Sequence, residues 1–183
     1  MPEFREAIGE KEMPLVIVRG LSRGGTQGKL HLGLVHYPCA LGRGGRGPKA
    51  GEGDGVTPTG RWPVRQVFFR PDRLSRPRTR LPVSPLSPNL GWCDAPGDAN
   101  YNRLVRLPYP ASHERLWRSD GLYDLVVVLG YNDSPRSQGR GSAIFLHLAH
   151  SDYRPTEGCV AIAREHMLTL LARLSPGDEL IIE

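Results

Sequence analysis

Near its C-terminal end, this 183-residue chain carries a histidine and a cysteine, His147 and Cys159, separated by a turn-rich segment. A thiol becomes a good nucleophile when it loses its proton, and a neighbouring imidazole can take that proton or stabilise the thiolate. Gly158, directly before Cys159, allows the backbone to approach a substrate closely, so that neighbouring N–H groups can bind an oxyanion. The pattern predicts an activated thiol with a histidine as its base.

The same residues admit other interpretations. Free cysteines and half-buried histidines are common in protein cores, so the pair can be structural. A zinc site made of His147, His150 and Cys159 supplies three ligands, but positions three apart on a strand face opposite sides and no fourth ligand stands out. Either histidine can serve as the base; we favour His147 because it stands on a strand, whereas His150 lies beyond it.

Two neighbouring strands would position the pair. Apolar and other side chains alternate over residues 143–148, with Phe145 and His147 on one face and Leu146 and Leu148 on the other, which is the period of a strand. The turn-rich segment 151–155 follows, and Cys159 leads into a short apolar run over 160–162. If the two strands lie side by side, His147 and Cys159 meet.

The rest of the chain also favours strands over helices. We expect strands at 15–19, 29–36, 61–70, 123–130, 143–148, 159–163 and 179–182, separated by Gly, Pro, Asn or Asp clusters. Apolar residues at helical spacing predict one helix over 164–174, and Ser112 is a candidate cap for a short helical turn over 112–118. Without alternating strands and helices, this pattern predicts a mainly β fold: a sandwich or partly closed barrel with one or two short helices.

The motif Thr156-Glu157-Gly158-Cys159 after a strand that carries His147, with Thr57-Pro58-Thr59-Gly60 upstream, resembles the L,D-transpeptidase (YkuD-like) family of peptidoglycan cross-linking enzymes. The similarity covers most of the chain, from about residue 30 to 180. Further short motifs resemble a compact Gram-negative branch of that family: Cys39-Ala40-Leu41-Gly42-Arg43, Glu52-Gly53-Asp54-Gly55, Arg70-Pro71-Asp72-Arg73, Gly91-Trp92-Cys93-Asp94 and Tyr131-Asn132-Asp133.

The resemblance implies a role for each matching position. Cys159 would be the acylated nucleophile and His147 its base, with the imidazole oriented by the backbone carbonyl of Leu148. N–H groups of Glu157, Gly158 and Cys159 would form the oxyanion hole. The expected substrate-binding residues are Arg154, Thr156, Glu157, Trp92 and Tyr101.

Three departures from the family pattern concern the donor site. Glu157 replaces the signature histidine, the interval from His147 to Cys159 is shorter than usual, and Ala161 stands where arginine or asparagine commonly occurs. A carboxylate at the pocket disfavours acidic donors, which affects specificity more than the acyl-transfer chemistry. Our hypothesis is that Glu157 recognises a donor amine or orients Arg154.

The resemblance also implies the reaction: a cysteine thioester formed at an L–D peptide bond and resolved by an acceptor amine. The bond would be L-Ala–D-Glu, giving 1–3 cross-links, or diaminopimelate–D-Ala, giving 3–3 cross-links. The partners would be peptidoglycan stem peptides, as donor and acceptor, with no cofactor and no metal. Two rival classes remain, a carboxypeptidase or endopeptidase that hydrolyses stem peptides and a non-catalytic wall-binding module.

Length and composition are consistent with one catalytic domain over residues 13–183, expected to be a monomer. We interpret residues 1–12 as a tail, an expression remnant or the product of an upstream start. The N-terminus is charged and lacks the apolar region of a signal peptide, and no run is long enough for a transmembrane segment. A periplasmic location is therefore expected from the function alone.

The basic excess does not indicate nucleic-acid binding. Three of the 24 basic residues are lysines and the other 21 are arginines, which are dispersed along the chain and suit carboxylate-bearing partners. The glycine-rich run 42–47 fits a dinucleotide-binding pattern, but Pro48 rather than a helix follows it. Cys39 and Cys93 are either a disulfide that leaves Cys159 free or two buried thiols.

Overall fold

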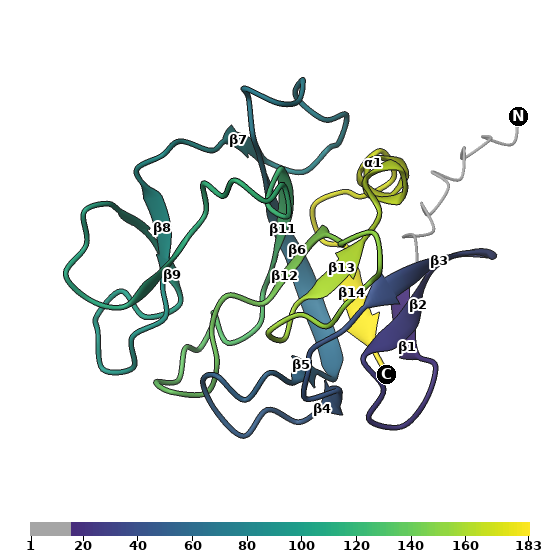
Figure 1. The fold of residues 1–183 in the computed structure, drawn as a ribbon, viewed down its shortest axis with the longest axis horizontal. Coiled ribbons are helices and arrows are strands. Elements are labelled where there is room, and N and C mark those ends of the chain that lie inside the picture. Colours follow the sequence, from purple (N-terminus) through teal and green to yellow (C-terminus); the bar gives the residue numbers. More distant parts are fainter. Residues whose placement is uncertain (1–15) are drawn as a thin grey trace, which may run out of the picture.

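The computed structural model describes residues 16–183, so the predicted tail at 1–12 lies outside the described residues. Nine strands form one sheet in the order β11-β12-β13-β3-β2-β1-β14-β6-β7, and a further pairing of β11 with β6 closes eight of them into a barrel (Figure 1). Three more strands form a separate sheet in the order β10-β8-β9, and β4 pairs with β5. The fold is mainly β, as predicted, with a closed barrel.

The strands have the following bounds: β1 Val16–Gly20, β2 Gln27–Leu32, β3 Val35–Ala40, β4 Arg46–Gly47, β5 Thr57–Pro58, β6 Gly60–Phe69, β7 Val83–Pro85, β8 Leu90–Cys93, β9 Arg103–Arg106, β10 His113–Arg115, β11 Leu125–Leu129, β12 Phe145–Leu148, β13 Val160–Ile162 and β14 Glu179–Ile182. The single helix within residues 16–183, α1, spans Arg164–Leu171.

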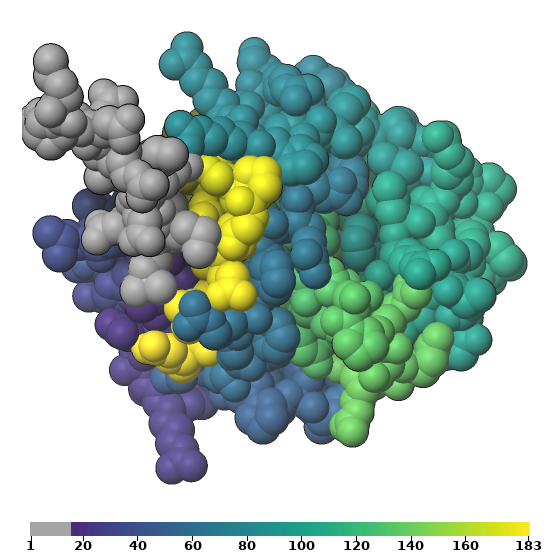
Figure 2. All heavy atoms as spheres, turned by 180° about the vertical axis from the view of Figure 1, so that it is seen from behind, coloured from purple at the N-terminus to yellow at the C-terminus, as the bar shows by residue number. Residues whose placement is uncertain are grey.

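Both ends of the described chain contribute to the barrel. β14 pairs in parallel with β1 and antiparallel with β6, so the C-terminal strand joins the first strand to the rest of the sheet. Figure 2 shows the C-terminal residues in yellow, lying between the purple N-terminal strands and the blue segment that follows them. The barrel therefore has no free edge where β1 and β14, the first and last described strands, lie side by side.

Two apolar clusters lie on opposite faces of β12. Leu146 and Leu148 belong to a large cluster that also holds the buried side of α1. Phe145 faces a second cluster, which contains Cys159 and lies between the barrel and the small sheet β10-β8-β9. The alternation predicted for residues 143–148 is confirmed, although the strand begins at Phe145 because Ala143 has a positive φ of 52°.

Most predicted elements are present with shifted ends, and two predictions are wrong. The strand expected over 29–36 is a hairpin of β2 and β3, because Gly33 adopts a φ of +61° and turns the chain. The helical turn expected over 112–118 is instead strand β10, which pairs antiparallel with β8. Ser112 gave a local capping signal, but backbone pairing to β8 decides the conformation there.

Candidate functional site

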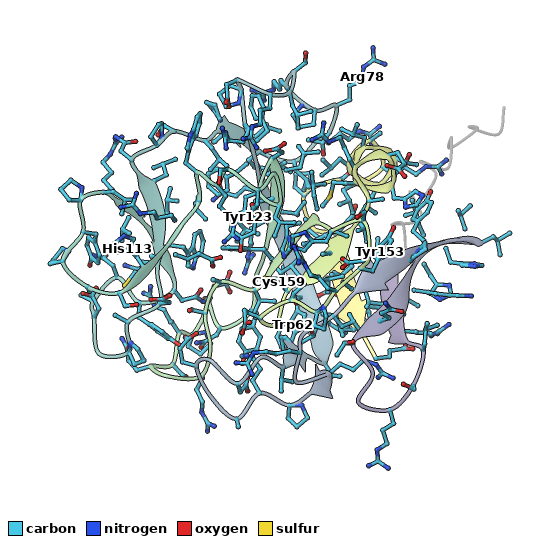
Figure 3. The ribbon with its side chains drawn as sticks, in the orientation of Figure 1. Trp62, Arg78, His113, Tyr123, Tyr153 and Cys159 are labelled. Carbon is cyan, nitrogen blue, oxygen red and sulfur yellow. The ribbon has the colours of Figure 1, made fainter. Side chains whose placement is uncertain are left out.

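His147 and Cys159 come together because β12 and β13 are neighbouring parallel strands. In the register of these strands, His147 is paired with Ala161, two residues beyond Cys159. The side chains of His147 and Cys159 line one cavity of about 420 Å³. Figure 3 shows Cys159 near the centre of the molecule with Tyr123 close by, whereas Arg78 points outward into solvent. The cavity also receives three predicted substrate-binding residues, Arg154, Thr156 and Glu157.

The imidazole of His147 is buried and held in one orientation. Its Nδ1 lies 2.9 Å from the backbone carbonyl oxygen of Leu148, which can only accept a hydrogen bond, so Nδ1 carries the proton and Nε2 is free to accept one. The Tyr123 ring packs edge-on against it, with ring centroids 5.1 Å apart. Burial lowers the pKa of His147 from 6.5 to about 4, so the imidazole is neutral at pH 7.

The Cys159 thiol has backbone partners. Sγ donates to the carbonyl oxygen of Ala143 at 3.2 Å and accepts from the N–H of Phe145 at 3.4 Å. Burial, followed by the charge of Glu114, raises the pKa of Cys159 from 9.0 to about 12. The site therefore holds a neutral thiol and a neutral imidazole in one cavity, so any attack by this sulfur would require the loss of its proton.

A tight turn presents the thiol to the cavity. Gly158 has a φ of +130°, and a Cβ atom at this position would lie 3.0 Å from the carbonyl oxygen of Val56, so glycine is the residue that fits. The Thr156 hydroxyl donates to the carbonyl oxygen of Cys159 at 2.6 Å and accepts from the N–H of Gly158 at 3.2 Å. Thr156 thus closes the turn, and the N–H of Gly158 has an internal partner.

The upstream motif Thr57-Pro58-Thr59-Gly60 reaches the same turn. The fully buried hydroxyl of Thr57 accepts from the N–H of Gly42 at 2.7 Å and donates to the carbonyl oxygen of Cys159 at 3.4 Å. Gly42 itself lies against this turn, since a Cβ atom there would be 3.0 Å from the Cα of Gly158. The motif therefore supports the backbone that carries Cys159.

The residues at the rim pair differently from one of our expectations. Glu157 does not contact Arg154: its carboxylate accepts from Nε of Arg43 at 2.7 Å, and its side chain is 79% exposed. Arg154 instead lies 2.9 Å from Nδ1 of His150. The hypothesis that Glu157 orients Arg154 is wrong, because Arg43 reaches the carboxylate from the neighbouring loop.

Two predicted substrate-binding residues do not line the cavity that holds Cys159. The Trp92 ring is buried against Phe145, and its Nε1 donates to Oδ1 of Asn102 at 2.9 Å. Tyr101 is fully buried and donates its hydroxyl hydrogen to Glu52. Tyr101 thereby holds Glu52, which lines the cavity, and the loop itself contributes Asp94 rather than these aromatic rings.

Several cavity residues were not singled out from the sequence. Glu114 and Tyr123 are hydrogen-bonded to each other, and Arg118 lies 3.9 Å from Glu114. Lys49 is paired with Asp54, and its charge favours ionisation of Cys159. Asp54 stands in one of the words that carry the family resemblance, whereas Glu114 lies in the segment predicted as helical, where no local signal marks it.

The other thiols and the alternative zinc site can now be placed. Cys39 on β3 and Cys93 on β8 are free, buried thiols on different sheets. In the described part of the chain, no group of three or more His, Cys, Asp or Glu residues is arranged to hold a metal ion.

Among residues 16–183, no helix is both long and apolar enough to cross a membrane.

Comparison with known proteins gives one match at the family level. The L,D-transpeptidase catalytic domain, YkuD, matches residues 26–182. Searches of curated proteins and of solved structures found no significant match. The matched region includes the Thr57 motif, His147 and Cys159 and covers the barrel from β2 to β14. This chain therefore belongs to the YkuD family of L,D-transpeptidase catalytic domains.

Proposed function

We propose that the protein cross-links peptidoglycan stem peptides through a thioester on Cys159. The observation that carries the proposal is the shared cavity: an imidazole on β12 and a thiol directly before the adjacent strand β13, with the free Nε2 of His147 fixed by the hydrogen bond to Leu148. Such an arrangement suits acyl transfer by a cysteine nucleophile. We infer a periplasmic location from this proposed function alone.

In the acylation step, Nε2 of His147 takes the thiol proton as Sγ of Cys159 attacks the carbonyl carbon of an L–D peptide bond. The N–H groups of Glu157 and Cys159 would bind the oxyanion, whereas that of Gly158, also expected to contribute, is bound to the Thr156 hydroxyl at 3.2 Å. The tetrahedral intermediate collapses as the imidazolium returns the proton to the departing nitrogen. The C–N bond breaks, the D-residue leaves as an amine, and the acyl group remains on sulfur.

In the second step, the acceptor amine attacks the thioester carbonyl. A C–N bond forms and the C–S bond breaks, and a proton passes from the amine nitrogen through His147 to the sulfur. An acceptor that arrives as an ammonium ion loses a second proton to solvent. The products are an amide cross-link and the original thiol.

The position of the basic side chains suits donors with a free carboxylate. Arg154 and His150 lie at the rim on the loop between β12 and β13. In both candidate donor bonds, L-Ala–D-Glu and diaminopimelate–D-Ala, the departing D-residue carries a carboxylate beside the scissile nitrogen, which an arginine can bind. We place L-Ala–D-Glu first, with 1–3 cross-links as the product, and diaminopimelate–D-Ala second.

Incubation with defined muropeptides tests the proposal. The protein and its Cys159→Ala variant are each given a disaccharide-tripeptide and a disaccharide-tetrapeptide, and the products are identified by mass spectrometry. New dimers that require Cys159 support a transferase, and fragmentation distinguishes 1–3 from 3–3 linkage. Shortened monomers without dimers would instead support hydrolysis, while identical products from both proteins would exclude a thiol mechanism.

A further inference from the structure

Acidic side chains gather on a part of the cavity to which neither the motifs nor the family match assigns a role. Glu52, Asp94 and Glu114 come from three separate segments: the loop before β5, the residue after β8, and β10. We call these three residues the acidic patch. The small sheet β10-β8-β9 therefore carries two carboxylates to a cavity whose nucleophile belongs to the barrel.

The negative charge of the acidic patch is only partly balanced by the protein. Asp94 and Glu52 are close enough to Glu114 that their charges add to the effect of burial, which is the largest cause of its raised pKa. Two cations that line the cavity, Lys49 and Arg118, have other partners. Lys49 is paired with Asp54, and Arg118 binds Asp120 at 2.6 Å but lies 3.9 Å from Glu114.

Unpartnered polar atoms accompany the acidic patch. Within residues 16–183, four buried side-chain nitrogen or oxygen atoms lack a hydrogen-bond partner, and two of them, Oγ of Ser142 and Oδ1 of Asp94, belong to residues that line this cavity. Ser142 is only 6% exposed. Because an unsatisfied buried polar atom is costly, the two atoms indicate a ligand that donates hydrogen bonds.

A primary ammonium group has the required chemistry. It carries one positive charge and three N–H donors and accepts no hydrogen bonds, so it can bind a carboxylate and a hydroxyl oxygen together. Among the described residues, no group of three or more His, Cys, Asp or Glu side chains is placed to hold a metal ion. The tyrosine hydroxyls that donate to Glu52 and Glu114 hold these two carboxylates in place.

We propose that the acidic patch, with Oγ of Ser142, binds the primary ammonium group of the acceptor substrate beside the acylated Cys159. The inference rests on the proposed transferase function and adds a location for the acceptor. Donor carboxylates are directed toward the basic side chains of Arg154 and His150. The acceptor ammonium group is directed toward the acidic patch. The separation of charge would thereby distinguish the two substrates that a cross-linking enzyme must bind.

The test isolates the second half of the reaction. Protein acylated by the donor muropeptide is separated from excess donor and mixed with either of two nucleophiles. One is an acceptor muropeptide with a primary ammonium group, and the other is hydroxylamine, which is small and uncharged at neutral pH. The rate of thioester loss and the identity of the product are followed by mass spectrometry, so that the rate with the ammonium acceptor can be divided by the rate with hydroxylamine.

Asp94→Asn removes a charge with little change of shape, and Glu52→Gln serves as a second variant. Loss of one charged hydrogen bond predicts that the ratio of rates falls about tenfold in Asp94→Asn. Glu165→Gln, which neutralises an exposed carboxylate on α1, keeps the wild-type ratio. An unchanged ratio in both Asp94→Asn and Glu52→Gln would overturn the acceptor site.

The same experiment separates this inference from the function on which it rests. If wild-type protein forms the thioester and dimers but the two variants keep the ratio, only the acceptor site is wrong. If both nucleophiles slow equally in the variants, the acidic patch acts on the thioester rather than on the ammonium group, and the acceptor site is again wrong. If wild-type protein forms no thioester, the proposed transferase fails, and the inference fails with it.

Discussion

At the scale of single residues, the site combines a thiol and an imidazole that are both uncharged at rest. Burial raises the pKa of Cys159 to about 12 and lowers that of His147 to about 4, so an ion pair between them is disfavoured. The hydrogen bond from Nδ1 of His147 to Leu148 then matters more than charge, because it leaves Nε2 as the acceptor. The site depends on orientation and on proton transfer during attack.

The raised pKa of Cys159 predicts slow alkylation at neutral pH. Because the thiolate is the reactive species, the rate with iodoacetamide should rise about tenfold per pH unit between pH 7 and 9. All three thiols are buried, and peptide mapping by mass spectrometry follows Cys159 separately from Cys39 and Cys93, which serve as internal references. A rate that is high and constant from pH 5 to 8 would show a preformed thiolate and contradict the neutral pair.

The lowered pKa of His147 predicts a specific loss of stability in acid. As pH falls below 6.5, the unfolded chain binds a proton at this imidazole that the folded protein excludes until about pH 4. The free energy of unfolding therefore decreases over this interval, by on the order of 3 kcal/mol from this group.

Urea unfolding at several pH values measures this loss in wild type and in His147→Gln. The variant lacks the titrating imidazole, so its stability should fall less steeply between pH 6.5 and 4. Carboxylates contribute equally to both proteins and cancel in the comparison. Parallel curves for the two proteins would show that the buried imidazole does not control this interval.

The choice of base is also decided at the residue scale. His147 has the fixed Nε2, whereas Nδ1 of His150 is occupied by Arg154. We expect His147→Ala to reduce thioester formation by at least about a hundredfold, which is typical of a lost general base. His150→Ala should keep most of the acylation rate and change mainly the concentration of donor required. Loss of acylation in His150→Ala alone would reverse the assignment.

At the scale of elements, the turn that carries Cys159 depends on two distant loops. Thr57 connects Gly42 to the carbonyl oxygen of Cys159, and Gly42 packs directly against Gly158. Three segments that lie far apart in the sequence thus fix the backbone that carries Cys159. This explains why the motif Thr57-Pro58-Thr59-Gly60 accompanies the Gly158-Cys159 pair although the motif itself supplies no reactive group.

Replacement of Thr57 tests that connection. Thr57→Val keeps the shape but leaves the buried N–H of Gly42 without a partner, and we expect a loss of about 1–3 kcal/mol in the free energy of unfolding. Thr57→Ser retains the hydroxyl, so its stability and its rate of acylation should stay closer to those of wild type than those of Thr57→Val. Urea unfolding measures the free energy of unfolding, and the rate of thioester formation measures acylation. Equal effects of the two substitutions would assign the role of Thr57 to packing instead.

The sequence predicted the elements that carry regular patterns. Alternation identified β12 with both of its faces, and β14 was predicted with its observed ends. The small sheet was not predicted, because its strands of three or four residues form only through pairing with each other. Glu114 was missed with it, since neither a motif nor a pattern in the 112–118 segment points to a cavity that distant segments create.

At the scale of the whole molecule, the barrel supplies His147 and Cys159, and the small sheet supplies part of the surrounding charge. The second apolar cluster joins them, with Trp92 and Phe145 in contact across the junction. Many arginines are used within the molecule: in nine of the ten ion pairs in the described part of the chain the cation is an arginine. Most arginines of these pairs therefore balance carboxylates of the same chain, and the cavity is lined by both acidic and basic residues.

The most direct test of the central claim is the intact mass of the protein after brief incubation with a donor muropeptide. The account predicts a mass increase equal to the donor acyl group, located on Cys159 by peptide mapping and released by hydroxylamine, as expected for a thioester. Cys159→Ala should show no increase, and addition of an acceptor muropeptide should discharge the wild-type adduct into a dimer. An adduct on another residue, or dimers formed equally well by Cys159→Ala, would contradict the account.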